Sequence, residues 1–354
     1  MSAGLVDKIA KAVLYEGYML YPYRPSSVKN QQRWNFGVLY PQAYSAAQQG
    51  TDACLSQTEC LVRGSVLPSI DIRVRFLQLV ERTIGRLADP RAEWPANGRA
   101  QFELVPSLEV RQRTFQPWRE AEEREISIRL VYGDSLASIP SQASHDFPAA
   151  RQFEPLRNDS DQIIGVIVRD KASLSVMVET SAKRCESDVF KIMVRICNQT
   201  PFEAPEQQTR DQALMYSLIS AHVVLGANNC EFVSLLDPPE ELREVASSCQ
   251  NVGMWPVMVG AAGSHDTMLS SPIILYDFPQ IAPESAGDLF DGLEIDEILS
   301  LRIMTMTDEE KREMRDSDDR ARQILERTES LPPEQLMKLH GILRSLRPLD
   351  KEVS

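Results

Sequence analysis

Apolar and polar residues alternate with a period of two along much of the chain between Val66 and Ala182. In SIDIRVRFLQL, residues 69–79, Ile70 and Ile72 fall on one face and charged residues on the other. This alternation is typical of a strand with one packed and one solvated face. Similar patterns occur in FELVPSLEVRQRTF, EISIRLVY, IIGVIVRD, LSVMVET and FKIMVRICNQT. The sequence therefore predicts about six antiparallel strands.

Helical spacing replaces this alternation on either side of the strand-rich region. In residues 3–14, apolar side chains at positions i, i+4 and i+8 share one side of a helix. In QTRDQALMYSLISAHVVLG, residues 208–226, apolar residues recur at helical spacing as far as Gly226, which predicts a second helix. A short helix that begins at Asp237 and the strand-like WPVMVG and SPIILYDF follow, so we expect a small α/β layer here.

The C-terminal region also has a helical pattern. Residues 295–303 carry an apolar stripe, and Thr307 with Glu310 fits a capping box that begins one long helix over 309–329. A last predicted helix follows Pro333, and its apolar stripe consists of Leu336, Leu339, Leu343 and Leu346. A stripe of this kind has to bury against another apolar surface.

These patterns together predict an α+β protein with an antiparallel β-rich N-terminal part, a small α/β layer and a helical, acidic C-terminus. At 354 residues the chain is about twice the usual size of one domain. We expect three parts: a β-rich domain over 1–205, an α/β portion over 206–306 and a helical extension over 307–354. Within the first part, residues 136–161 are rich in Ser, Ala and Pro, which predicts a long exposed loop.

Charge is distributed unevenly along the chain. The formal net charge is -13, but residues 1–150 carry 17 basic and 16 acidic side chains, so the negative charge lies in the remainder. A surface of this sign repels nucleic-acid phosphates and anionic membranes, so we expect no nucleic-acid partner. No apolar run is long enough to cross a bilayer, and the first residues do not form a secretory signal. These observations predict a cytoplasmic protein without membrane insertion.

The residue types that bind cofactors are dispersed. The six cysteines form no CxxC pair, which argues against a zinc ribbon or a disulfide framework. No GxxxxGK[ST] or GxGxxG string is present, and VGAAGSHD, residues 259–266, is expected to be a turn rather than a nucleotide cradle. The sequence therefore predicts no cofactor.

Residues 15–44 form the most unusual segment, with six tyrosines, one tryptophan and three prolines. Tyrosine, tryptophan and arginine are enriched in protein interfaces, and the same side chains also stack on bases or small ligands. A third interpretation is that the segment covers the sheet and satisfies its own polar groups. For the interface hypothesis, the candidate partner-binding residues are Tyr18, Tyr21, Tyr23, Arg24, Arg33 and Trp34, together with the leucine stripe of the last helix.

Catalytic and metal-binding candidates are few. His265 lies next to Asp266 with serines nearby, but adjacent residues in an extended chain point in opposite directions, so Asp266 is poorly placed to orient the imidazole. Asp291, Glu294 and Glu297 would share one side of a helix and offer oxygen ligands to a hard cation, but a solvated acidic face or a partner-docking surface is the favoured interpretation.

Three long stretches resemble one bacterial family. They are LYEGYMLYPYRPSSVKNQQRWNFGVLYP, SLISAHVVLGANNCEFVSLLDPPEELRE and DTMLSSPIILYDFPQIAPESAGDLFDGLEIDEILSLRIMTMTDEEKREMR, which together span much of the chain. The sequence is similar to an uncharacterised family encoded with high-affinity nickel-iron uptake hydrogenases. The resemblance implies a role in the maturation, assembly or partner contacts of a hydrogenase, and it assigns no catalytic or ligand residues.

Two main functions follow from these observations. The first is a non-enzymatic accessory protein, scaffold-like or chaperone-like, that binds a larger protein such as hydrogenase subunits; dispersed histidines and cysteines fit this better than metal delivery. The second is an enzyme of another type, with a pocket between the β-rich and α/β portions. A homo-oligomer is compatible with either.

Overall fold

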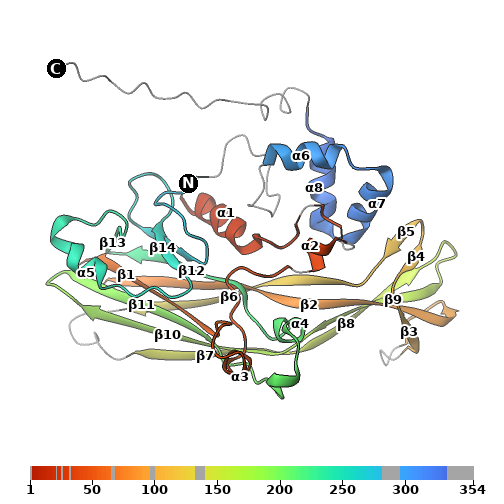
Figure 1. The fold of residues 1–354 in the computed structure, drawn as a ribbon, viewed down its shortest axis with the longest axis horizontal. Helices are drawn as coiled ribbons and strands as arrows, with labels where there is room; N and C mark the ends of the chain where they lie inside the picture. The colour runs from red at the N-terminus through yellow and green to blue at the C-terminus, as the bar shows by residue number, and fades with distance from the viewer. Residues whose placement is uncertain are drawn as a thin grey trace.

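The structure is a computed structural model that describes residues 2–20, 22–24, 27–31, 33–64, 68–95, 100–131, 140–280 and 296–332. In this part of the chain, antiparallel sheets are flanked by helices, which confirms the predicted α+β class (Figure 1). The smaller sheet contains, in spatial order, β13 (Glu231–Val233), β1 (Leu55–Arg63), β11 (Val189–Asn198), β10 (Leu174–Arg184) and β7 (Ser141–Phe147).

The larger sheet is organised around one very long strand, β2 (Ser69–Arg91). Its spatial order is β14 (Trp255–Met258), β15 (Thr267–Ser271), β12 (Ile219–Asn228), β2, β9 (Ile163–Lys171) and β8 (Ala150–Arg157), while β6 (Trp118–Val131) and β3 (Phe102–Val105) also pair with β2. A separate hairpin joins β4 (Leu108–Val110) to β5 (Arg113–Phe115). Strand β2 pairs with β12 along its first half and with β9 along its second half. The larger sheet therefore continues beyond β12, and we call this continuation the arm.

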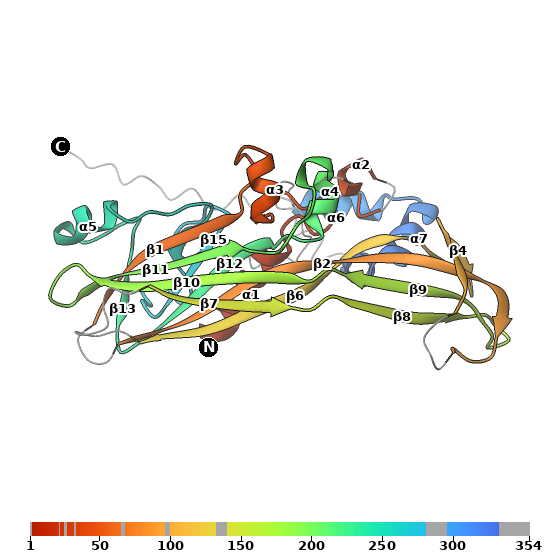
Figure 2. The ribbon, with the colours of Figure 1, turned by 90° about the horizontal axis from the view of Figure 1, so that it is seen from below.

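The main core lies where the two sheets stack. Alternate residues of β2, such as Ile72 and Val74, pack there with Val176 of β10 and Val194 of β11. The arm formed by the second half of β2 with β8 and β9 extends beyond the smaller sheet (Figure 2). Its two faces are therefore covered by smaller apolar clusters, such as the one around Ile84 and Ile167.

The helices gather mostly on one side of the larger sheet (Figure 1). They are α1 (Ser2–Tyr15), α2 (Val28–Gln31), α3 (Gln42–Ala47), α4 (Arg210–Leu214), α5 (Arg243–Ser247), α6 (Asp296–Met304), α7 (Asp308–Ser317) and α8 (Asp319–Glu329), with 3-10 turns at Pro205–Gln207 and Glu240–Leu242. The predicted helix over 3–14 is confirmed as α1, and Ile9 and Val13 on its apolar side pack against β12, β14 and β15. The capping box of Thr307 and Glu310 is also present at the start of α7.

The helix predicted over 208–226 is wrong. Only α4 is helical there, and the apolar residues after it form β12, which lies inside the larger sheet between β15 and β2. Residues 219–225 are buried on both faces of the strand, between the smaller sheet and α1. A strand buried on both faces is continuously apolar and imitates a buried helix. The residues of the expected α/β layer therefore contribute β12, β14 and β15 to the antiparallel sheet that contains β2, and the division of the chain at residue 205 stays a prediction.

The predicted loop over 136–161 is also wrong in its described part. Residues 141–147 form β7 and residues 150–157 form β8, each at the edge of a sheet. Both strands are polar and largely exposed, so they lack the apolar alternation that marks a half-buried strand. Charged and polar edge strands are common because they discourage pairing with other chains.

The long helix predicted over 309–329 is interrupted. Asp318 adopts an extended conformation with φ -153° and ψ 148°, which ends α7 and caps α8. The interruption turns the two helices against each other, so both apolar faces reach the same cluster. The strand expected in SPIILYDF, residues 271–278, is wrong, because β15 covers 267–271 and ends at the first residue of this stretch. Strand β1 has no counterpart among the predicted strands.

A strand glycine in the arm provides a test of its packing. A Cβ at Gly165 would lie 2.2 Å from Cδ2 of Leu108 and 2.9 Å from the carbonyl oxygen of Gly85. We expect Gly165→Ala to lower the free energy of unfolding by about 1–3 kcal/mol, since backbone must move to relieve the overlap. Urea unfolding measures the change. The control is Gly226→Ala in β12, where the nearest atoms lie 3.9 Å away; equal losses in both variants would contradict the packing described.

Candidate functional site

The aromatic segment 15–44 is turned into the molecule. Tyr18, Tyr23, Arg33 and Trp34 are at most 4% exposed, and they lie in a cluster with α6, α7 and α8. As they lie, these four side chains offer no surface to a partner. Arg24 is half-buried, and its guanidinium pairs with two carboxylates of α7, those of Glu310 and Glu313. The candidate Tyr21 lies outside the described residues. This arrangement matches the interpretation in which the segment covers the sheet.

Arg33 is the buried anchor of this segment. Its guanidinium lies 3.6 Å from the ring centroid of Trp118 and 4.5 Å from that of Trp34. It donates to the carbonyl oxygens of Tyr18 at 2.7 Å and Arg119 at 2.6 Å. Burial lowers the pKa of Arg33 to about 10, so the group is still charged at neutral pH. Cation–π contacts and carbonyl groups thus replace the water that a guanidinium normally keeps.

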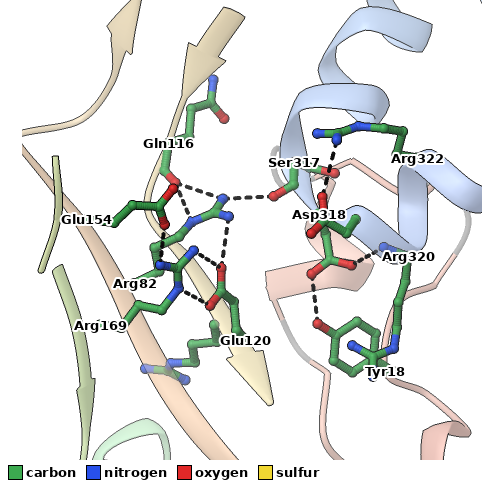
Figure 3. A network of polar contacts seen from close by, with 12 residues as sticks. Tyr18, Arg82, Gln116, Glu120, Glu154, Arg169, Ser317, Asp318, Arg320 and Arg322 are labelled. Carbon is green, nitrogen blue, oxygen red and sulfur yellow. Dashed lines mark hydrogen bonds and ion pairs between the residues drawn. The ribbon is translucent and has the colours of Figure 1, made fainter. Parts of the chain in front are cut away.

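Tyr15, Tyr18, Asp318 and Arg320 connect the two ends of the described chain, and we call them the N–C clamp (Figure 3 labels three of them). The Tyr18 hydroxyl donates to Oδ2 of Asp318 at 2.8 Å, and Oδ1 accepts from the backbone N–H of Arg320 at 2.8 Å. The Arg320 guanidinium donates to the Tyr15 hydroxyl. Burial and the neighbouring Asp318 carboxylate raise the pKa of Tyr18 well above its usual value. Asp318 therefore caps α8 and binds the N-terminal segment at the same time.

A charged cleft of about 460 Å³ lies beside the clamp, between the larger sheet and the junction of α7 with α8 (Figure 3). Among the described residues that line it are Arg82, Arg113, Arg169, Arg320 and Arg322, and the carboxylates of Glu120, Glu154, Asp316, Asp318 and Asp319. The formal charges of these side chains cancel. The cleft is therefore not, by charge alone, a site for an anion or a cation.

The arginines at the centre of the cleft are already engaged. Arg82 donates to Oε1 of Glu120 at 3.0 Å and to the carbonyl oxygen of Ser317, the last residue of α7, at 2.8 Å. Arg169 donates to Glu120 and Glu154, both at 2.6 Å. Burial lowers the pKa of Arg169, but the hydrogen bonds that it donates to these two carboxylates outweigh burial and raise its pKa. The network joins the sheet to the C-terminal helices and leaves no nucleophile paired with a base among the residues drawn in Figure 3.

His265 and Asp266 do not form a catalytic pair. Nδ1 of His265 lies 3.1 Å from the carbonyl oxygen of Phe232, while the Asp266 carboxylate accepts from the hydroxyl of Thr267 at 2.9 Å. Neither residue lines the charged cleft. The expected turn at 259–266 is present between β14 and β15.

The remaining candidates cannot be placed. Asp291 and Glu294 lie outside the described residues, as does the side chain of Glu297, and so do the partner-binding candidates Leu336, Leu339, Leu343 and Leu346. Among the residues that are described, no three His, Cys, Asp or Glu side chains are grouped as metal ligands. No helix in the same part of the chain is long and apolar enough to span a membrane.

An exposed apolar surface lies at the edge of the larger sheet next to β14. We call it the β14-edge patch and define it by Leu236, Trp255, Ile274 and Tyr276, which are 56%, 40%, 76% and 87% exposed. Trp255 opposes Ser271, the last residue of β15, and the following chain returns along β14 until the N–H of Phe278 donates to the carbonyl oxygen of Met258. Exposed apolar side chains that gather at one edge of a sheet commonly mark interaction sites.

The patch has a local cause in the sequence. In residues 273–276, Ile273 and Leu275 pack against the cluster beneath α1, so Ile274 and Tyr276 point the other way. Asp277 holds the segment in place, since its carboxylate accepts from the N–H of Met258 at 2.8 Å and from the Ser234 hydroxyl at 2.5 Å. An extended run that is apolar on both faces, at the edge of a sheet, was the signal in the sequence, and it was interpreted only as a strand.

Comparison with known proteins found no matching protein-family model and no matching curated sequence. The resemblance to a hydrogenase-associated family therefore stays a prediction. Among the described residues, the β14-edge patch contains the two most exposed large apolar side chains, Ile274 and Tyr276, whereas the charges of the cleft are paired with one another.

The N–C clamp makes a testable contribution to stability. We expect Asp318→Ala to lower the free energy of unfolding by about 2–3 kcal/mol, because it removes a helix cap and leaves the buried Tyr18 hydroxyl without its acceptor. Denaturant unfolding gives the value. Asp319→Ala is the matched control, since its side chain is 85% exposed and its loss is expected within about 0.5 kcal/mol. A smaller loss for Asp318→Ala than for the control would contradict the clamp.

His222 is a buried titratable group beneath α1. Its Nδ1 lies 2.9 Å from the carbonyl oxygen of Ser220, which makes Nδ1 the protonated nitrogen, and Nε2 has no partner among the described residues. Burial lowers the pKa of His222 from 6.5 to about 4, with Arg75 adding to the effect. A second proton would bind Nε2, which is buried and has no acceptor among the described residues, so the folded chain disfavours the charged imidazolium.

Stability should therefore depend on pH through His222. Between pH 6.5 and 4, His222 is protonated in the unfolded chain but not in the folded chain. The free energy of unfolding therefore falls as the pH falls, by about 3 kcal/mol in total. Below about pH 4 this group contributes no further change. We expect His222→Gln to lack this component, which urea unfolding at several pH values measures as a difference between the variant and the wild type. Parallel curves for the two proteins would show that the histidine is not shielded.

Proposed function

We propose that this protein is a non-enzymatic accessory or assembly protein that binds a larger protein partner through the β14-edge patch. The observation that carries the proposal is the exposure of Ile274 and Tyr276, at 76% and 87%, on a segment fixed at both ends. Moving large apolar and aromatic side chains out of water is favourable in free energy, and such side chains form the hot spots of protein interfaces. A fixed segment also loses little conformational entropy when it binds.

The surroundings of the patch indicate the kind of partner surface that fits it. Leu236 and Asp237 donate their N–H groups to the Ser234 hydroxyl, which in turn bonds to Asp277, so the acidic run 237–244 begins beside Tyr276. This run contains four acidic side chains and one arginine. A partner surface with an apolar centre and basic residues at its rim is complementary to this arrangement.

The family resemblance supplies the candidate partner, a subunit of a nickel-iron hydrogenase, and with it a cytoplasmic location. Scaffold-like or chaperone-like binding fits this role, because it needs a surface and no reactive group. The β14-edge patch takes the place of the aromatic segment in the proposal, since the described aromatic side chains are buried under the C-terminal helices. The leucine stripe of the last residues remains a second candidate contact.

An enzymatic function has less support. That proposal required a polar pocket in which His265 and Asp266 converge, and the two side chains bind separate neighbours on a turn. The charged cleft of about 460 Å³ lies elsewhere, and its central charged groups are paired with one another. We therefore develop the binding function alone.

Affinity capture on purified hydrogenase subunits tests the proposal. We expect the double variant Ile274→Asp with Tyr276→Asp to weaken binding at least about tenfold, because two apolar anchors become charges that must be desolvated. Binding is measured by biolayer interferometry, and far-UV circular dichroism checks that the variant is folded.

The matched control is the double variant Leu104→Asp with Val131→Asp, which introduces the same two charges at side chains that are 62% and 50% exposed, on β3 and β6. This variant should bind as the wild type does. Equal binding by the patch variant and the wild type would refute the patch as the contact surface, and no binding by the wild type would refute the hydrogenase as the partner.

A further inference from the structure

We infer that β7 is the seam of a symmetric dimer, in which the β7 strands of two copies of this chain pair antiparallel. This pairing goes beyond the proposed function, because β7 and the β14-edge patch belong to different sheets. Strand β7 is the last strand of the smaller sheet (Figure 2). An edge strand presents N–H and C=O groups that can bond to a strand of another chain.

The other described edges of the two sheets are protected against strand addition. The N–H of Phe232 in β13 donates to the carbonyl oxygen of His265, and the N–H of Phe278 donates to that of Met258 in β14. Strand β8 contains Pro155, β3 is only four residues long, and β6 has seven charged side chains in its sequence WREAEEREISIRLV. Coverage, proline, shortness and charge are the usual devices that keep an edge from pairing.

Strand β7 lacks these devices. Its sequence, SQASHDF, contains one acidic side chain, that of Asp146, and no proline, lysine or arginine. Within the described residues, β7 pairs with β10 alone, and no other backbone hydrogen bond reaches it. Its hydroxyl and amide side chains are also compatible with a neighbouring strand, because such groups hydrogen-bond across a strand pair.

The hydrogen bonds of the smaller sheet show which groups of β7 face outward. The N–H of Gln199, just after β11, donates to the carbonyl oxygen of Ser175 in β10 at 2.9 Å, so the peptide groups of Ser175 point toward β11. Because successive residues of a strand alternate in this respect, those of Val176 point toward β7, where Val176 opposes His145. Odd-numbered residues of β7 therefore bond to β10. The outward N–H and C=O groups belong to Gln142, Ser144 and Asp146.

These three residues are complementary to a second copy of themselves. A two-fold axis perpendicular to the sheet at Ser144 aligns all seven residues of β7 with those of the second copy. Ser144 then opposes Ser144 of the second copy, and Gln142 opposes Asp146, and each such pair exchanges both of its backbone N–H···O bonds. The Gln142 amide can donate to the Asp146 carboxylate, and no like charges lie opposite each other.

The dimer is expected to be weak and to leave the β14-edge patch of each copy free. One pair of seven-residue strands buries a small area, so the two copies should separate on dilution. A dimer would present two β14-edge patches at once. An assembly with two partner sites would thus hold both copies more tightly than one patch holds one site.

Sedimentation equilibrium on the full chain tests the seam. We expect the wild type to dimerise reversibly with a dissociation constant of about 1–100 μM. Ser144→Lys and Ser144→Glu should each weaken dimerisation at least about tenfold, because like charges then lie directly opposite each other. The controls Gln152→Lys and Gln152→Glu add the same charges at an exposed position of β8 and should dimerise as the wild type does. Far-UV circular dichroism checks that each variant is folded.

An equimolar mixture of Ser144→Lys and Ser144→Glu tests the register. Heterodimers should form at least as tightly as the wild-type dimer, because lysine then opposes glutamate at the centre of the seam. This rescue requires that residue 144 of one copy lies opposite residue 144 of the other. A mixture that dimerises no better than either variant alone would overturn the inference.

Three other outcomes would also overturn it. One is a wild type that stays monomeric over this concentration range. Another is a dimer that survives both Ser144 variants but is lost in Ile274→Asp with Tyr276→Asp, which would assign the contact to the β14-edge patch. The third is a monomeric wild type whose binding to the hydrogenase subunits is weakened by Ser144→Lys, which would assign the edge of β7 to a strand of that partner. A dimer that follows the Ser144 variants stands even where no hydrogenase subunit binds, so the proposed function can fail separately.

Discussion

The burial of the N-terminal aromatic segment between the long strand β2 and the C-terminal helices is the interaction on which the rest of the structure depends. It joins residues some 300 positions apart, as in the hydrogen bond from Tyr18 to Asp318. Burying Arg33 and Asp318 is costly, and cation–π contacts, a helix cap and carbonyl acceptors compensate for it. Without the helices, the tyrosines would lie on a solvated sheet; without the tyrosines, α8 would lose the partner of its cap.

This arrangement decides which surfaces are left for recognition. The arginines and carboxylates of the charged cleft are paired with one another to hold α7 and α8 to the sheet, as Arg82 does through Glu120 and Ser317. The described tyrosines and the tryptophan of residues 15–44 lie inside the molecule. Within the described structure, Ile274 and Tyr276 stay exposed at the edge of the larger sheet. This apolar edge, which Asp277 holds in place, differs from the aromatic surface that composition suggested.

Local patterns predicted those elements whose environment is simple. The strands β2, β9, β10 and β11 alternate between a packed and a less packed face, and α1 and the cap of α7 use short-range rules of spacing and hydrogen bonding. Prediction failed at the extremes of burial. Strand β12 is buried on both faces and looked helical, while β7 and β8 are exposed edges and looked like a loop. In each case the missing information was the neighbouring strand.

By itself the sequence determined the α+β class, the helix α1, the start of α7 and the unusual concentration of aromatic side chains in residues 15–44, because these follow from residue type and periodicity. Only the tertiary structure decided that Tyr18, Arg33 and Trp34 point inward and that Ile274 and Tyr276 point outward. The physical reason is that burial depends on contacts between segments far apart in the chain. The hydrogen bond between Tyr18 and Asp318 buries the aromatic segment, and the position of β14 at the edge of the sheet leaves Ile274 and Tyr276 exposed.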